Sequence, residues 1–422
     1  MLSAVILLLP LSAPVGLLLA DGALLLVALT DGLLAPAPGR VKVERTLPGI
    51  LPLGAAGEVT WSLTNPLARR LRMALADELA PSLQPGSRRA RLTLPPRGRV
   101  TVRTSIHPTR RGRFQLRELV VRAEGPLGLL ARQSRRELPG LLRVYPPFRS
   151  RQEAEMRIDR ARILEVGLRS AKGRGGGTEF DQLRDYSVDD ESRRMDWAAT
   201  ARAGRAIVRT YRAERNQTVL LLLDNGRVMA GRVAGVPRVE HAMDAVLMLT
   251  AVATRLGDRA GLVAFDRRVR AVVAPGHGRG QLSRVSEAMY QLEPELAESD
   301  YRGAFVETLS RFRRRSLLVV LTELAEQAIS ETLMPALPLI VRSHLVIVAS
   351  VRDPDLVRWA EATPEEAGMA FRKAAAQDAL DHRRHTMARL RGLGVTVVDA
   401  PPGELAPVLA DAYLRAKATG RL

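Results

Sequence analysis

The segment Thr218-Val219-Leu220-Leu221-Leu222-Leu223-Asp224 decides the fold of the carboxyl-terminal half of this 422-residue chain. Its unbroken run of Val and Leu is typical of a strand that is buried on both faces of a parallel sheet. Helical and strand-like patterns then alternate: helices over 238–256, 281–292, 303–312, 329–341 and 365–391, strands over 260–265, 269–273, 316–321, 344–350 and 395–398, and a terminal helix. This alternation predicts a doubly wound α/β domain with a parallel sheet over residues 216–422.

Polar residues follow two of these predicted strands. Asp224 ends the first strand, and the pair Thr322-Glu323 comes directly after the strand over 316–321. Ligands of open α/β sheets bind beyond the carboxyl ends of the parallel strands. We therefore expect the binding edge of this domain to lie around these residues.

Residues 41–147 follow a different pattern, in which short alternating strands are separated by turn residues. Residues 58–64 alternate polar and apolar side chains and end at Asn65-Pro66, and residues 99–104 and 118–122 alternate in the same way. This pattern predicts a small β-sandwich. The region shows no acid pair, histidine cluster or nucleophile motif, so we interpret it as a structural or adaptor domain.

Residues 1–38 predict a membrane anchor. Only Asp21 and Asp31 are charged between Met1 and Ala35, and an uncharged run over 2–20 approaches the roughly 20 residues that cross a bilayer. The pair Asp21-Gly22 offers a turn into a second short apolar segment. We therefore expect one or two transmembrane helices.

A cleavable signal peptide is the alternative for this segment, but the first residues lack the positive region that such peptides use. Basic residues begin directly after the apolar block, at Arg40, Lys42 and Arg45. The positive-inside tendency then favours a cell-membrane protein whose bulk is cytoplasmic.

The overall charge excludes little by itself. Basic residues outnumber acidic residues by 64 to 45, and only four of the basic residues are lysine. The arginines are scattered among Ala, Leu and Gly, and the few aromatic residues show no stacking pattern, so nucleic-acid binding is disfavoured. The absence of cysteine excludes disulfides, thiolate nucleophiles and cysteine-ligated metals.

Residues 148–215 contain a segment that is dense in charged and aromatic residues. It runs from Gly177-Thr178-Glu179-Phe180-Asp181 through Arg184-Asp185-Tyr186 and Asp190 to Arg193-Arg194-Met195-Asp196-Trp197 and Ala201-Arg202. This run resembles the signature of the domain of unknown function 58 family, G-x-E-F-x-x-L-R-x-Y-x-x-G-D-D-x-R-x-I-D-W-x-A-x-A-R. The positions that depart from it include Asp189, which stands in place of Gly, and Met195, which stands in place of Ile.

The resemblance implies a membrane-anchored protein whose α/β domain is von Willebrand factor A-like. It also implies a MoxR-type AAA+ ATPase as partner, with this chain presenting or receiving an unknown client protein. We accordingly expect a protein-binding or chaperone-like adaptor rather than an enzyme. The chain has no ATP-binding motif of its own.

Domains of this kind often bind Mg²⁺ through a D-x-S-x-S loop after the first strand. Here the loop reads Asp224-Asn225-Gly226-Arg227-Val228, so the first acid is present and both hydroxyl residues are missing. Asp300 and Glu323 occupy the stretches where such domains place their remaining ligands. We expect no standard metal site. The three acids together could still make an oxygen-rich pocket, so Mg²⁺ at a degenerate site is one alternative. The other is that Arg227 forms ion pairs with these acids.

The signature segment admits two interpretations. Its acids and arginines are spaced closely enough for an ion-pair network, beneath which we expect Phe180, Tyr186 and Trp197 to pack. The alternative is a carboxylate cluster that binds a divalent metal in a hydrolase, which the neighbouring arginines disfavour. The candidate interaction or structural residues are Glu179, Phe180, Asp181, Arg184, Tyr186, Asp190, Arg193, Asp196, Trp197 and Arg202.

One further pair of histidines has a spacing that permits chelation. His382 and His385 lie three residues apart in a predicted helix, with Arg383 and Arg384 between them. We interpret this stretch as a solvated basic helix face.

Overall fold

The computed structural model describes residues 13–171, 179–187, 192, 195–212, 216–326 and 329–419. It is a mixed α/β structure with several sheets and an apolar amino-terminal helix. The chain forms two compact units, Met1–Tyr145 and Pro146–Leu422. Each unit has its own sheets and its own hydrophobic core.

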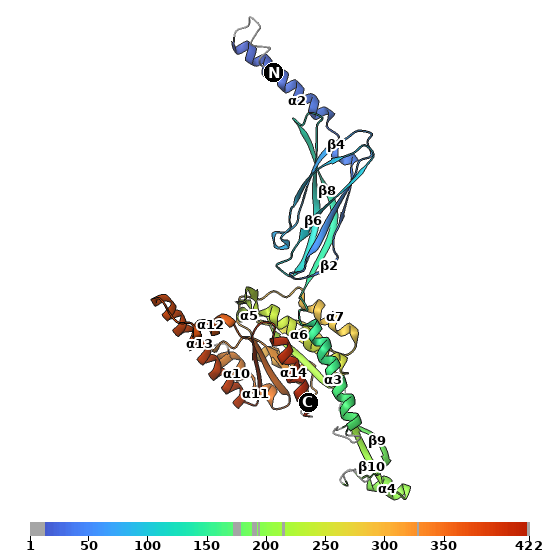
Figure 1. Cartoon of the computed structure of the whole chain (residues 1–422), viewed down its shortest axis with the longest axis vertical. Helices are drawn as coiled ribbons and strands as arrows, with labels where there is room; N and C mark the ends of the chain where they lie inside the picture. The colour runs from blue at the N-terminus through green and yellow to red at the C-terminus, as the bar shows by residue number, and fades with distance from the viewer. Residues whose placement is uncertain are drawn as a thin grey trace. The chain divides into compact units, whose positions relative to one another are not determined.

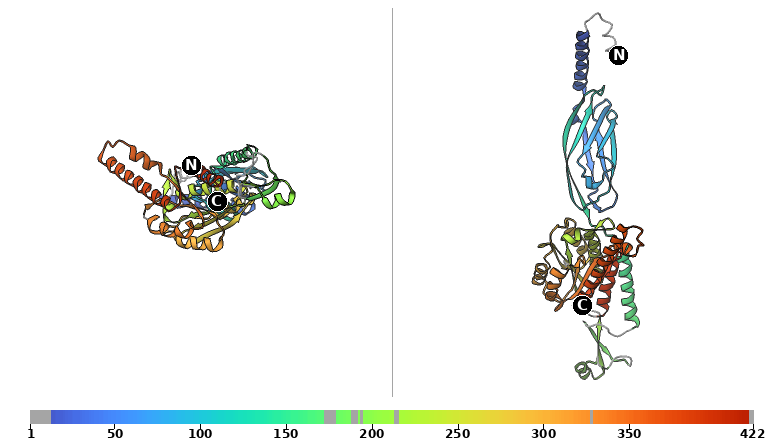
Figure 2. Two further views of the ribbon diagram at one scale, coloured as in Figure 1. Left: turned by 90° about the horizontal axis from the view of Figure 1, so that it is seen from below. Right: turned by 90° about the vertical axis from the view of Figure 1, so that its left-hand side faces the viewer.

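The first unit contains two sheets whose long strands run side by side (Figure 2). One sheet has the strand order β1-β3-β6 and the other the order β2-β8-β7-β4-β5. Neighbouring strands are antiparallel except β2 and β8, which are parallel. The strands are β1 (Lys42–Thr46), β2 (Ile50–Pro52), β3 (Gly57–Thr64), β4 (Leu71–Asp77), β5 (Arg89–Leu94), β6 (Arg99–Ile106), β7 (Gly112–Glu124) and β8 (Ala131–Tyr145), and the 3-10 helices are η1 (Pro38–Arg40) and η2 (Pro81–Leu83).

Apolar side chains from both sheets form the core of this unit. Trp61 of β3 is fully buried, and its indole N–H donates to Asp77 Oδ2 over 2.6 Å. The other oxygen of Asp77 lies 2.5 Å from Nη1 of Arg45. Both charged side chains are almost completely enclosed. The core therefore includes a buried ion pair that the alternating strand pattern alone did not predict.

The helix α2 (Ala13–Leu34) precedes the strands and is long and apolar enough to cross a membrane (Figure 1). Its 22 residues would extend about 33 Å at the α-helical rise. This helix suggests a membrane anchor. Because α2 continues through Asp21-Gly22, the turn predicted there is wrong: a single glycine costs a helix only about 1 kcal/mol, and the flanking Leu and Ala residues favour helix.

The second unit is built on a sheet of six strands with the order β15-β14-β11-β16-β17-β18. The pairs β11–β14, β11–β16, β16–β17 and β17–β18 are parallel, and the edge strand β15 is antiparallel to β14. The strands are β11 (Thr218–Asp224), β14 (Arg259–Phe265), β15 (Val269–Gly276), β16 (Leu317–Leu321), β17 (Leu345–Val351) and β18 (Thr396–Ala400).

Helices cover both faces of this sheet. The strand β11 therefore contributes side chains to a hydrophobic core on each side. Leu221 and Leu223 belong to one core, and Leu220 and Leu222 belong to the other. The first core includes residues of α6 (Arg238–Arg255), α7 (Arg279–Met289) and α14 (Leu405–Ala418). The second includes residues of α8 (Tyr301–Arg311), the π-helical turn η4 (Ile329–Leu333), α10 (Met334–Ala336), α11 (Pro338–Val341) and α13 (Ala367–Gly392).

Residues 148–215 form structure of their own where the structure describes them. The helix α3 (Arg151–Ala171) buries Ala154 and Ile158 in the first core of the sheet. It is followed by the antiparallel pair β9 (Glu179–Asp185) and β10 (Ile207–Arg212), with the short helix α4 (Trp197–Ala203) between them (Figure 1). We call the described residues 179–187 and 195–212 the signature arm. Other elements of the unit are α5 (Arg227–Ala230), β12 (Arg232–Val233), β13 (Val236–Pro237) and α12 (Pro354–Glu361).

Candidate functional site

The carboxylate of Asp224 lies at the carboxyl end of β11 and is fully buried. Its Oδ1 accepts hydrogen bonds from Ser299 Oγ over 2.5 Å and from the Gly226 N–H over 2.8 Å. Its Oδ2 lies 2.7 Å from the Tyr301 hydroxyl and 2.6 Å from Thr322 Oγ1. Both oxygens are therefore occupied by donors of the chain itself, and the charge is satisfied without water or a cation.

The sheet brings these donors together. Leu223 of β11 pairs with Leu321 of β16, so Asp224 and Thr322 leave the same edge of the sheet side by side. Ser299 and Tyr301 come from the start of α8, and the carboxylate of Asp300 between them accepts from the Gly303 N–H and caps the helix. Asp300 therefore serves the helix terminus, while its two neighbours reach Asp224.

The absence of a side chain at Gly226 makes room for the Ser299 hydroxyl beside Asp224. A Cβ atom at this position would lie 2.1 Å from Ser299 Oγ, which is far inside contact distance. A serine in the loop and the observed Ser299 contact are therefore incompatible. In this chain the hydroxyl group comes from residue 299 instead of from the loop.

The Tyr301 hydroxyl remains a neutral donor in this environment. Its side chain is enclosed, with the ring 5.4 Å from that of Phe265 between centroids. Burial, followed by the negative charge of Asp224, raises the pKa of Tyr301 well above its ordinary value. The hydroxyl therefore keeps its proton and can donate to the carboxylate.

Glu323 has a different set of partners. It is buried, and its carboxylate lies 2.5 Å from Arg383 Nη1 and 3.2 Å from Arg238 Nε. Arg383 also pairs with Asp399 over 2.7 Å. The prediction that Arg383 lies on a solvated basic face is wrong, because this arginine points into the unit and balances two buried acids.

The three candidate metal ligands thus have separate roles. Among the described residues, no group of three His, Asp or Glu side chains is placed to hold a metal ion. The predicted ion pairing of Arg227 with these acids is wrong, because Arg227 pairs instead with the exposed Glu298 over 3.1 Å. Asp224 and Glu323 are buried, so of the three acids only Asp300 is exposed at the binding edge.

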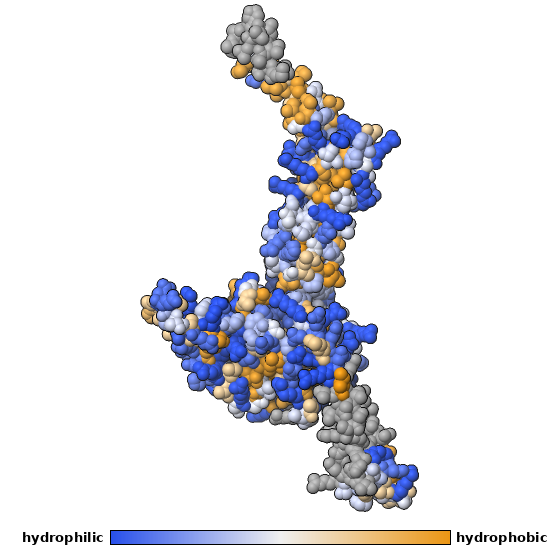
Figure 3. All heavy atoms as spheres, in the orientation of Figure 1, coloured by the Kyte–Doolittle hydropathy of each residue, from blue (hydrophilic) through white to orange (hydrophobic). Residues whose placement is uncertain are grey.

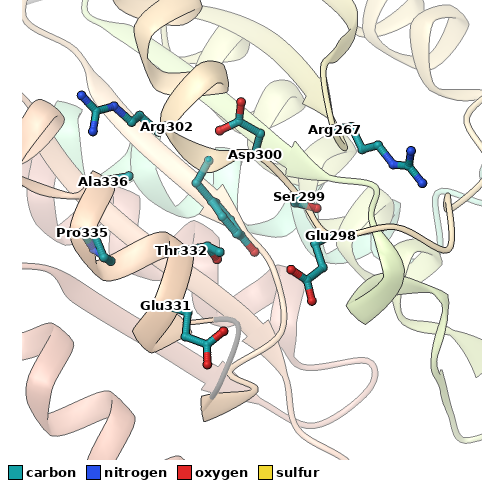
Figure 4. A pocket seen from close by; sticks show the side chains of 10 residues that line it. Arg267, Glu298, Ser299, Asp300, Arg302, Glu331, Thr332, Pro335 and Ala336 are labelled. Atoms are coloured by element: carbon teal, nitrogen blue, oxygen red, sulfur yellow. The ribbon is translucent and has the colours of Figure 1, made fainter.

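A pocket of about 500 Å³ opens beside this network (Figure 4). Ser299 and Tyr301 belong to both the pocket wall and the Asp224 network. Figure 4 shows Arg267 and Arg302 on opposite sides of the opening. Acidic side chains also contribute to the wall, so both charge signs are available to a polar ligand. The lining residues are Arg267, Glu298, Ser299, Asp300, Tyr301, Arg302, Glu331, Thr332, Pro335 and Ala336.

In the signature arm, Asp196 organises the turn before α4. Its carboxylate accepts from the Ala199 N–H over 2.9 Å and thereby caps the helix, and it pairs with Arg209 Nε over 2.7 Å. The Ala199 amide, followed by Arg209, lowers the pKa of Asp196 below its ordinary value. Asp196 is therefore committed to holding the arm together.

Two other residues of the predicted network also bind within the arm. Arg184 donates to the carbonyl oxygen of Asp185, and Arg202 donates to that of Ala198. Asp190 and Arg193 lie outside the described residues. Glu179, Phe180 and Asp181 lie in β9, where only the backbone is described.

Two aromatic residues of the arm, Tyr186 and Trp197, depart from the prediction. Trp197 is 70% exposed and Tyr186 is 37% exposed, so neither packs beneath an ion-pair network. Leu183 of β9 is also exposed, at 42%. A two-stranded sheet with one short helix has room to bury small residues, and Ala199 and Val208 take those positions. The arm thus presents apolar side chains on its surface.

Comparisons with known proteins complete the description. No curated protein matches the chain. Two structures of the CARDB domain of the PF1109 protein from Pyrococcus furiosus are similar to it. The solution structure is 11% identical, over 24% of this chain and 94% of that chain, with a TM-score of 0.17. The crystal structure, in complex with di-metal ions, is 12% identical, over 25% and 86%, with a TM-score of 0.17.

The structure of WR4, a member of the MSP family of C. elegans, is 12% identical over 25% of this chain and 97% of that chain, with a TM-score of 0.18. These scores carry no functional argument. The family model described as "Protein of unknown function DUF58" matches residues 182–383, which include much of the signature arm and most of the six-stranded sheet. This match supports the DUF58 family for the chain.

Proposed function

We propose that this protein is a membrane-anchored protein-interaction or chaperone-like adaptor that acts with a MoxR-type AAA+ ATPase. In this proposal α2 is the anchor, the bulk of the chain is cytoplasmic, and the α/β unit is a von Willebrand factor A-like domain. The observation that carries the proposal is the Asp224 carboxylate, which is saturated by four donors of its own chain.

The strand arrangement supports a von Willebrand factor A-like domain. Five strands are parallel and the edge strand β15 is antiparallel, and Asp224 ends the inner strand β11. The loop after this strand is where domains of that kind carry their metal-binding motif. Here the hydroxyl groups of Ser299 and Thr322 lie around Asp224. They donate hydrogen bonds to its carboxylate, in a site that is rich in oxygen atoms.

The chemistry of the edge supports binding rather than catalysis. The buried acids are engaged by hydroxyls and arginines, which leaves no free carboxylate among Asp224 and Glu323 to activate water. The exposed features are the charged pocket rim and the apolar side chains of the signature arm. Exposed Trp and Arg residues are frequent anchors in protein interfaces.

The proposal is tested by purifying the full-length, detergent-solubilised protein from cells with nucleotide present and identifying co-purifying proteins by mass spectrometry. We expect an AAA+ ATPase, with recovery reduced severalfold in Trp197→Ala on the arm or in Arg302→Glu at the pocket. Phe371→Ala and Arg358→Glu are matched controls, because Phe371 is 78% exposed and the Arg358 side chain is 70% exposed on other elements.

Failure of this proposal has a defined form. Recovery of no AAA+ ATPase from the native protein would contradict the partnership, and equal recovery from all variants would contradict the proposed surfaces. Stoichiometric divalent metal in the purified protein, with an activity lost on chelation, would favour the metal-dependent hydrolase instead.

A further inference from the structure

The end of α2 is fastened to the hairpin between β7 and β8 by a single buried carboxylate. Asp31, in the last turn of α2, is 1% exposed. Its Oδ1 accepts from the Leu127 N–H over 2.7 Å, and its Oδ2 accepts from the N–H groups of Leu129 and Leu130 over 2.8 and 3.0 Å. The apolar helix and the hairpin tip, residues 125–130, therefore meet in a defined geometry.

Two glycines make this close approach possible. A Cβ atom on Gly125 would lie 2.4 Å from the carboxylate of Asp31, and one on Gly32 would lie 2.9 Å from Leu130 Cδ1. Larger residues at either position would push the helix away from the hairpin. The sequence is thus suited to holding the tip against the last turn of α2.

The backbone of the hairpin tip has its N–H groups satisfied from within. Gly125 donates to the carbonyl oxygen of Leu130, and Gly128 donates to that of Gly125. Pro126 has no N–H, and the remaining three N–H groups bind Asp31. Pairing of these N–H groups lowers the cost of moving the tip from water into an apolar phase, where an unpaired backbone donor is expensive.

The side chains of the tip are apolar and exposed. Leu127, Leu129 and Leu130 are 64%, 54% and 44% exposed, where a water-exposed turn would ordinarily carry polar residues. Leu33 and Leu34, at the end of α2, are exposed as well, at 69% and 57%. Figure 3 shows the exposed apolar surface of α2, with hydrophilic side chains on the adjoining part of the first unit.

Cationic side chains lie next to this apolar surface. Arg69 donates to the carbonyl oxygen of Leu34 over 3.0 Å. Arg72 Nη1 lies 3.6 Å from the position of a Cβ atom on Gly128. Both arginines are exposed, as is Arg132 just after the tip. Arginines at this level suit the anionic headgroups of a bilayer surface.

From these observations we propose that the hairpin tip, residues 125–130, is a second membrane contact, with its leucines in the boundary between headgroups and acyl chains. The proposal rests on the proposed membrane anchoring by α2. It adds that the hydrogen bonds of Asp31 fix the strands of the first unit close to the bilayer surface, so that α2 does not connect to them through a flexible linker. The occupant of the apolar tip is lipid.

The test uses the full-length protein in vesicles of phosphatidylcholine and phosphatidylglycerol. The chain has no native cysteine, so single-cysteine variants can carry an environment-sensitive fluorophore without background. Leu127→Cys reports the tip, and Ile50→Cys on β2 is a control with the same exposed fraction, 64%. Leu25→Cys on α2 reports insertion of the anchor. The probe for lipid contact is a phosphatidylcholine with a nitroxide near the top of its acyl chain.

We expect blue-shifted emission and strong nitroxide quenching at residues 127 and 25, and neither effect at residue 50. Quenching at 25 without quenching at 127 would overturn the hairpin proposal and leave the anchor intact. Absence of quenching at both would overturn the membrane anchoring itself. A blue shift at 127 that grows with protein concentration and is not quenched by the lipid would assign the tip to a second copy of the chain.

Discussion

At the scale of single residues, the Asp224 carboxylate depends on hydroxyls that the sequence places far from it. Ser299 and Tyr301 are 75 and 77 residues away along the chain, and Thr322 is 98 residues away. The strand pattern was sufficient to place Asp224 and Thr322 at one edge of the sheet, because both follow predicted strands. It could not identify Ser299 and Tyr301 as partners, because the path of a loop before a helix has no periodic signal.

We predict that Tyr301→Phe lowers the free energy of unfolding of the α/β unit by about 2 kcal/mol, because a neutral donor to a buried charge is lost. Tyr290→Phe is the control, since the Tyr290 hydroxyl contacts the neutral amide of Gln291 and its loss should cost about 1 kcal/mol. Urea unfolding followed by circular dichroism measures both. Equal costs would show that Asp224 gains no special support from Tyr301.

At the scale of elements, the predicted alternation reproduces the regular part of the second unit. The helix predicted over 238–256 is α6 (Arg238–Arg255), and the strand predicted over 260–265 is β14 (Arg259–Phe265). The short helix α12 was missed, because its eight residues make only about two turns and none of them is buried. The signature arm was missed for a related reason: β9 and β10 are rich in charged residues and lack the apolar alternation that marks a half-buried strand.

A histidine connects the starting ends of two strands of the sheet, and we therefore expect the stability of the second unit to depend on pH. The Ser316 N–H, just before β16, donates to Nδ1 of His344, just before β17. Burial lowers the pKa of His344 below its ordinary value, and burial lowers that of His241 as well. The neutral rings are therefore favoured in the folded state.

The unfolded chain takes up protons at these histidines as the pH falls through about 6.5, while the folded chain resists. The stability contributed by the neutral rings is present above that pH and is lost on acidification. We predict that His344→Gln makes the decline in urea midpoint below about pH 6.5 shallower. An equally steep decline in His344→Gln would contradict the assignment.

At the scale of the whole molecule, stability is divided between two units with separate cores. The first core contains Trp61 and the enclosed pair of Arg45 with Asp77, and the second unit contains the two cores of the six-stranded sheet. Composition and alternation indicated the strands of the first unit, but the ion pair joins positions 32 residues apart through contacts that only the folded sheets create. Hydropathy likewise predicted an anchor, whereas its attachment to the hairpin by Asp31 required the structure.

If the two units unfold independently, a destabilising substitution in the core of the first unit should lower the stability of that unit alone. Asp77→Ala removes the acceptor of the Trp61 indole and leaves Arg45 enclosed without its ion-pair partner, which should cost about 3–5 kcal/mol.

With Trp197 and Trp359 replaced by Phe, Trp61 becomes the reporter of the first unit, and far-UV circular dichroism reports mainly the helices of the second. Asp77→Ala should move the Trp61 transition to lower urea and leave the helical transition in place. Glu58→Ala, which removes an exposed pair with Arg103 on the same sheet, should move neither. If the two transitions shift together in Asp77→Ala, the units unfold as one cooperative body and the division fails.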